Sequence, residues 1–106
     1  MGVIDNGTGN AQTGLKVLYF SHDECSVCKV LKPKVNKLVK HEFDNVLFEY
    51  IDIRNQPSLA ADYSVFTVPT VLLLADGKEM VRFVRSFGID QIREKLTRYV
   101  QLYNPL

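Results

Sequence analysis

The pattern of apolar and polar positions along the chain predicts four β-strands. Residues 15–20 form a nearly continuous apolar run, which is typical of a strand buried on both faces of a sheet. Residues 46–53 and 70–75 read as two further strands. An Asp-Gly pair follows the third run and predicts a tight hairpin turn into an antiparallel strand over residues 79–87.

After the first strand and a short polar loop, the apolar period becomes that of a helix. Apolar side chains recur every three or four residues from Cys25 to about His41, at Val27, Leu31, Val35, Leu38 and Val39. Pro33 lies inside this helix, where its missing N–H removes a hydrogen bond. We therefore expect a kink at Pro33.

Two further helices are expected. Residues 58–65 form a short one after Pro57, whose missing N–H costs nothing at a helix start. Gly88 ends the last strand and Asp90 is a candidate N-cap for the final helix. That helix carries an apolar stripe at Ile92, Leu96, Tyr99, Val100 and Tyr103. The order β-α-β-α-β-β-α predicts an α/β fold, a central mixed sheet with helices on both faces.

Length and charge bound the domain organisation and the partners. The 106 residues suffice for one domain with a single core. Residues 1–14 are rich in Gly, Asn and Thr and are expected to form a disordered tail, which leaves residues 15–106 as the domain. The net charge of +1, with both signs interleaved, gives no basic stripe for nucleic acid. No apolar run approaches the ~18 residues of a membrane span.

The chain contains two cysteines, Cys25 and Cys28. So low a count is typical of a reducing compartment, where a cysteine pair is more often catalytic or metal-binding than structural. No secretory signal is recognisable at the N-terminus. These observations predict a cytoplasmic protein.

The position of the pair, after a buried strand and at the start of a helix, predicts dithiol chemistry. At a helix start, residues i and i+3 lie roughly 5 Å apart (Cα–Cα), within the range of a disulfide. Unpaired N–H groups and the helix dipole favour a thiolate at Cys25 and lower its pKa, so Cys25 would attack a substrate disulfide. Cys28, one turn further in and more buried, would resolve the mixed disulfide.

A metal half-site and an inert pair are the alternative interpretations. His22, Cys25, Cys28 and His41 are all residue types that bind zinc. His41 lies 13 residues beyond Cys28 on the same predicted helix, a rise of roughly 20 Å. Because zinc–ligand bonds are roughly 2.0–2.3 Å long, His41 cannot complete such a site, and no metal is expected. His22 alone is interpreted as an exposed loop residue.

Over residues 15–103 the chain resembles the thioredoxin family. The matching features are Cys25-Ser26-Val27-Cys28-Lys29 after a strand, Pro33, Asp52, Asn55, Pro57, the segment Tyr63-Ser64-Val65-Phe66-Thr67-Val68-Pro69-Thr70, the hairpin Asp76-Gly77-Lys78-Glu79, and Gly88. The resemblance implies a thioredoxin fold and a thiol-disulfide oxidoreductase that exchanges protein disulfides. It also implies a cis bond between Val68 and Pro69, although most X–Pro bonds are trans.

The resemblance assigns roles to individual residues. Cys25 and Cys28 would be catalytic, and Pro33 structural. The substrate groove would be formed by Glu24, Ser26, Val27, Val68, Pro69 and Gly88. No cofactor is implied. The expected partners are protein disulfide substrates and an unidentified reductase, and the protein is expected to be a monomer.

Three features depart from the family pattern. Glu24 stands where the family has Trp, and the chain contains no Trp, so a charge replaces an aromatic substrate platform. Tyr19 aligns with a buried Asp that helps to deprotonate the resolving thiol. The Lys near that Asp has no clear counterpart, since Glu49 and Tyr50 occupy the neighbourhood. These departures keep an alternative open, a thioredoxin-fold binding or adaptor module with little redox turnover.

Glutaredoxins are the nearest redox rival, because Thr67-Val68-Pro69 also fits their pattern. The Gly-Gly pair expected after their following strand is missing, and residues 79–87 are expected to continue as one long strand. Glutathione binding is therefore disfavoured.

Overall fold

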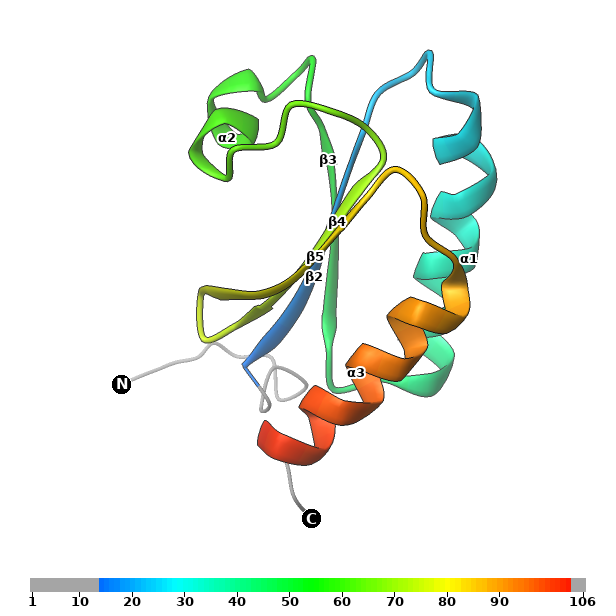
Figure 1. Cartoon of the computed structure of the whole chain (residues 1–106), viewed down its shortest axis with the longest axis vertical. Helices are drawn as coiled ribbons and strands as arrows, with labels where there is room; N and C mark the ends of the chain where they lie inside the picture. The colour runs from blue at the N-terminus through cyan, green and yellow to red at the C-terminus, as the bar shows by residue number, and fades with distance from the viewer. Residues whose placement is uncertain (1–13, 104–106) are drawn as a thin grey trace.

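The computed structural model describes residues 14–103, which form a four-stranded sheet and three helices (Figure 1). In chain order the elements are β2 (Leu15–Ser21), α1 (Ser26–Glu42), β3 (Leu47–Asp52), α2 (Pro57–Asp62), β4 (Thr70–Ala75), β5 (Lys78–Val84) and α3 (Ile89–Tyr103). The predicted order of elements is confirmed. Of the expected tail, only Gly14 lies within the described residues, and its carbonyl accepts a hydrogen bond from the Asp76 N–H at 2.9 Å.

The sheet has the strand order β3-β2-β4-β5, so β2 and β4 lie at its centre. β2 pairs parallel with β3 and antiparallel with β4, and β4 pairs antiparallel with β5. Every residue of β4 and all but one of β2 are buried. The continuous apolar runs of these two segments therefore belong to strands covered on both faces, as predicted.

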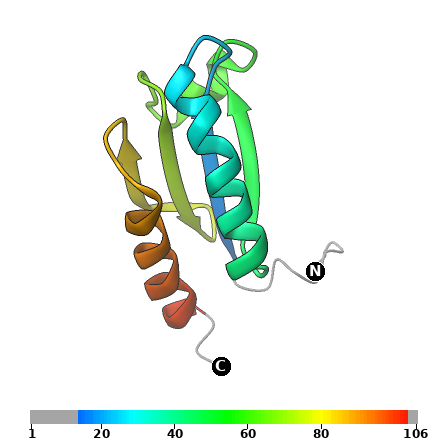
Figure 2. The same ribbon diagram turned by 90° about the vertical axis from the view of Figure 1, so that its right-hand side faces the viewer.

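The helices cover the two faces unequally. α1 and α3 lie on one face and the short α2 lies on the other (Figures 1 and 2). The larger core, under α1 and α3, includes Tyr19, Cys28 and Val35. The smaller core includes Phe20 and Leu72. Because side chains alternate along a strand, consecutive residues of β2 supply the two cores, and Tyr19 faces α1. None of the helices within residues 14–103 combines the length and the apolar character needed to cross a membrane.

Two element ends differ from the prediction. β5 ends at Val84 rather than at residue 87, because Arg85 has a φ of 62°, which is not a strand conformation. The Arg85 N–H still donates to the Pro69 carbonyl at 2.9 Å, in register with the ladder, but Pro69 has no N–H to return a bond. α3 begins at Ile89, so Asp90 lies inside its first turn and the N-cap prediction is wrong.

Two turns use positive φ angles. Asp76 and Gly77 have φ of 51° and 83°, the conformation that a type I′ hairpin requires, and the hairpin prediction is confirmed. Ser64 has a φ of 56°. The chain has left the helical conformation there, and α2 ends at Asp62 rather than at residue 65.

Candidate active site

The site is built where β2 ends and α1 begins. Cys25 is the N-cap residue of α1, in an extended conformation with φ −86° and ψ 101°. Its Sγ atom accepts a hydrogen bond from the Cys28 N–H at 3.2 Å. N-cap side chains normally satisfy N–H groups that the first turn leaves without partners. Here the acceptor is sulfur, so a donor and the positive end of the helix dipole both act on Cys25.

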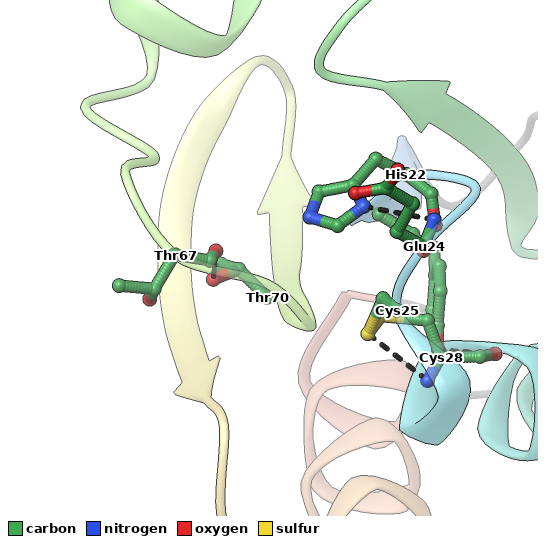
Figure 3. Close-up of a disulfide and its surroundings, with 8 residues drawn as sticks. His22, Glu24, Cys25, Cys28, Thr67 and Thr70 are labelled. Carbon is green, nitrogen blue, oxygen red and sulfur yellow. Dashed lines mark hydrogen bonds between the residues drawn. A yellow bond between two sulfur atoms is a disulfide. The ribbon is translucent and has the colours of Figure 1, made fainter.

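Cys28 lies one turn into α1 and is 1% exposed, whereas Cys25 is partly exposed. The two residues form a disulfide with a Cα–Cα distance of 5.2 Å, close to the expected value (Figure 3). The unequal exposure means that a large molecule reaches the sulfur of Cys25 and not that of Cys28. α1 continues through Pro33 as one helix, and the kink expected there stays a prediction.

The loop before α1 folds around His22. The Cys25 N–H donates to the His22 carbonyl at 3.2 Å, and the Glu24 N–H donates to His22 Nδ1 at 3.2 Å (Figure 3). His22 is partly buried, so the interpretation of it as an exposed loop residue is corrected. His22 therefore helps to hold the turn that places Cys25 at the helix start.

Glu24 is paired with Arg54 from the loop after β3, at 2.9 Å. The guanidinium hydrogen bond and its positive charge lower the pKa of Glu24, so this carboxylate is ionised at neutral pH. Both side chains are more than half exposed, and such surface pairs contribute little to stability. Their effect on Cys25 is electrostatic: Arg54 offsets an anion that would oppose a thiolate. Arg54 was not predicted, because nothing in the residues around Glu24 indicates a partner 30 residues away.

Beneath the cysteines, Tyr19 is fully buried and its hydroxyl donates to the Cys28 carbonyl at 3.1 Å. Tyr50 is its neighbour in the parallel β2–β3 ladder, and the two rings stack with centroids 6.1 Å apart. Burial, and then the charge that Tyr50 would carry, raise the pKa of Tyr19, which stays protonated as a donor. The Lys32 ammonium lies 3.8 Å from the centroid of the Tyr50 ring. The thioredoxin resemblance implies a buried Asp and a nearby Lys in this region. In this chain the region contains Tyr19, Tyr50 and the α1 residue Lys32.

The loop before β4 contributes the next predicted residues. The Val68–Pro69 bond is cis, as the resemblance implied. Pro69 is buried, and Val68 packs partly buried against the same core as Cys25. The Thr70 hydroxyl donates to the Thr67 carbonyl at 2.8 Å. Figure 3 places this loop among the surroundings of the disulfide.

A hollow of about 440 Å³ lies beside the start of α1, lined by Ser26, Val30, Leu31, Lys34 and Phe87. Ser26 was predicted to belong to the groove, and the other four residues were missed. Val30 is 61% exposed. An apolar residue at a helix position outside the core-facing stripe is the sequence feature that could have indicated this hollow. A Cβ atom at Gly88 would meet no atom within 4 Å, so the surface there is open.

The predicted site residues come from three segments: the β2–α1 loop with the start of α1, the loop before β4, and the β5–α3 connection that contains Gly88. Figure 1 shows these segments at the same end of the sheet. Val27 belongs to α1, and its side chain lies outside the described part of the structure. Within residues 14–103, no group of three or more His, Cys, Asp or Glu side chains is arranged to hold a metal ion.

Comparison with known proteins gives consistent matches. The Thioredoxin family model matches residues 9–98. The chain is 35% identical over 86 residues to Thioredoxin-like protein YdfQ of Bacillus subtilis, covering 81% of this chain and 76% of that protein. It is 35% identical over 95 residues to the thioredoxin of Chlamydia trachomatis, covering 90% and 92%. The structure of thioredoxin 1 from Thermosipho africanus has 42% identity and a TM-score of 0.78, covering 84% of this chain and 98% of that one.

Proposed function

The chain belongs to the thioredoxin family and is a thioredoxin-like thiol-disulfide oxidoreductase with a Cys-x-x-Cys dithiol, and from this premise we propose roles for its site residues. Cys25 is the nucleophile and Cys28 is the resolving cysteine. One observation carries this assignment: Cys25 is the accessible N-cap of α1, whereas Cys28 is 1% exposed. Only the first sulfur is both reachable and stabilised as a thiolate by the helix start.

The proposed reaction has two exchange steps. The Cys25 thiolate attacks one sulfur of a protein disulfide, so that a mixed disulfide forms and the substrate bond breaks. The expelled substrate thiolate takes a proton from solvent. Cys28 then loses its proton and attacks the Cys25 sulfur, which forms the disulfide seen in the structure and releases the second substrate thiolate. The substrate gains two electrons and two protons, and a reductase of unidentified nature returns the pair to the dithiol.

The substrate segment is proposed to lie along Val68, Pro69 and Gly88, with Glu24, Ser26 and Val27 at its edge. An extended peptide pairs with backbone groups in a strand-like way. The open surface at Gly88 supports this path. The apolar hollow offers room for one side chain of the substrate. The reducing compartment and the monomeric state stay predictions.

Insulin reduction driven by dithiothreitol tests the assignment. The wild type is expected to accelerate insulin precipitation, and Cys25→Ser is expected to fall to the dithiothreitol background. Cys28→Ser, which keeps the nucleophile, is expected to accumulate a mixed disulfide that mass spectrometry locates on Cys25. Equal rates for wild type and Cys25→Ser would contradict the proposal and favour the adaptor module.

A further inference from the structure

A pocket of about 200 Å³ lies between the first turns of α1 and the strands β2 and β3, and the buried Cys28 is part of its wall. Its wall includes Cys28, Lys32 and Tyr50. The other titratable groups that face it are His22 and Asp23 from the loop before α1, and Lys29 from the same helix. This pocket is separate from the hollow beside Ser26, and none of the proposed roles uses its charged groups.

Lys32 has a fixed position at this pocket. It follows Cys28 by four residues, so the two side chains lie on the same face of α1. Its ammonium lies 3.8 Å from the Tyr50 centroid, where the negative face of an aromatic ring attracts a cation. The Tyr50 ring stacks on Tyr19, and the Tyr19 hydroxyl is bonded to the Cys28 carbonyl. A continuous set of contacts therefore links the ammonium to the residue that must become a thiolate.

The tyrosines themselves are unsuited to accept the Cys28 proton. The Tyr19 hydroxyl already donates its own proton to a carbonyl, and burial keeps it protonated. The pocket places charged side chains next to Cys28: the cations Lys29 and Lys32, and the anion Asp23. Of these three, Lys32 is the one that a described contact holds against the sheet, through the Tyr50 ring.

We propose that Lys32, held by the Tyr19–Tyr50 stack, is a positioning residue that stabilises the Cys28 thiolate during the resolving step. The inference rests on the proposed function, since it concerns the second exchange. The proton of Cys28 leaves to solvent through the pocket. The Cys28 thiolate then attacks the Cys25 sulfur, the Cys25–substrate bond breaks, and the electron pair departs with the substrate sulfur, which is protonated by solvent.

This role predicts a pH signature. If removing the Lys32 charge raises the pKa of Cys28 by about one unit, the thiolate fraction at neutral pH falls roughly tenfold. A thiolate of higher pKa is also a better nucleophile, with a Brønsted slope of about 0.4–0.5. The rate constant for attack by the thiolate therefore rises roughly threefold, which offsets part of the loss. The net resolving rate should therefore fall about three- to fourfold at neutral pH. Above both pKa values the variant should be roughly threefold faster than wild type.

Stopped-flow reaction of the reduced protein with an aromatic disulfide, dithiobis(nitrobenzoate), measures the resolving step directly. Attack by Cys25 releases the first coloured thiolate, and attack by Cys28 on the mixed disulfide releases the second. The pH profile of the second phase is compared for wild type, Lys32→Gln and Lys32→Arg. Lys37→Gln is the matched control, because Lys37 is an exposed lysine of the same helix outside this pocket.

The proposal predicts that Lys32→Gln crosses the wild-type profile, that Lys32→Arg restores it, and that Lys37→Gln follows it. It is overturned if Lys32→Gln superimposes on Lys37→Gln, or if Lys32→Gln is slower by one constant factor at every pH, which is the result of a merely structural role. Absence of a second phase in the wild type would instead refute the proposed function, and with it this inference.

Discussion

Replacing Tyr19 by phenylalanine removes one hydroxyl from a fully buried position and keeps the stacked ring. The hydroxyl donates to the Cys28 carbonyl at 3.1 Å, so the variant loses one buried hydrogen bond. Such a bond contributes about 1 kcal/mol net to stability. The carbonyl left behind lies within α1, where an intrahelical N–H is also in reach, so the larger cost of an unsatisfied group does not apply. We expect the free energy of unfolding to fall by about 1 kcal/mol at neutral pH.

The same substitution should reverse its sign in alkali. Burial raises the pKa of Tyr19 above that of an unfolded tyrosine, which is about 10. The contribution of protonated Tyr19 to the free energy of unfolding is therefore fully present below about pH 10. It is lost as the pH rises from there towards the pKa that Tyr19 has in the folded protein. Once the unfolded tyrosine ionises and the folded one does not, the wild type loses about 1.4 kcal/mol per pH unit through this group. Tyr19→Phe escapes this loss, so the two proteins should become equally stable close to pH 11.

Guanidinium unfolding of the oxidised proteins, followed by far-ultraviolet circular dichroism from neutral pH to about pH 11, tests both parts. Tyr50→Phe is the control at neutral pH, because the structure gives its hydroxyl no hydrogen bond among residues 14–103, and its cost should be smaller. Wild type and Tyr19→Phe whose stabilities run parallel over the whole range would refute the reasoning. Because wild type and Tyr19→Phe share every other tyrosine, the difference between their unfolding free energies reports on Tyr19 alone.

Four further substitutions test other features of the structure. Gly77→Ala places a side chain at a φ of 83° with open space around it, so backbone strain alone should lower the unfolding free energy by about 1–2 kcal/mol in chemical denaturation; an unchanged midpoint would contradict this. Arg54→Gln should raise the pKa of Cys25 and Glu24→Gln should lower it, as ultraviolet thiolate absorbance would report; shifts of the same sign would exclude the electrostatic account. Arg82→Lys removes the planar guanidinium that donates from β5 to the carbonyls of Tyr63 and Ser64, just beyond α2. It should lower the thermal midpoint more than the exposed substitution Lys37→Gln does.

The fold could be predicted because its central strands carry a local signal. β2 and β4 are continuous apolar runs, and the Asp76-Gly77 turn needs only the two residues that form it. The end of β5 depends on a positive φ at Arg85, opposite Pro69, and no glycine in residues 85–87 indicates such a conformation. The types and cores of the elements were therefore predicted, whereas the ends of α2 and β5, which depend on positive φ angles at Ser64 and Arg85, were missed.

The same division applies within the site. The spacing of Cys25 and Cys28 at a helix start is a local feature, and the Cα–Cα distance matches it. The partner of Glu24 depends on where the loop after β3 returns, so Arg54 could not be predicted from the residues around the cysteines. Lys32 was visible as one of several lysines on α1, and only the stacked ring of Tyr50 distinguishes it from the others.

The parallel register places Tyr50 beside Tyr19. An acid at position 19 would be fully buried next to the neutral ring of Tyr50. A buried charge without a partner is strongly destabilising. The tyrosine at position 19 avoids that cost, and the cation in this region is Lys32 at the edge of the pocket. The first exchange depends on the α1 N-terminus, which this change leaves intact, so the second exchange is the step in which this oxidoreductase should differ from its relatives.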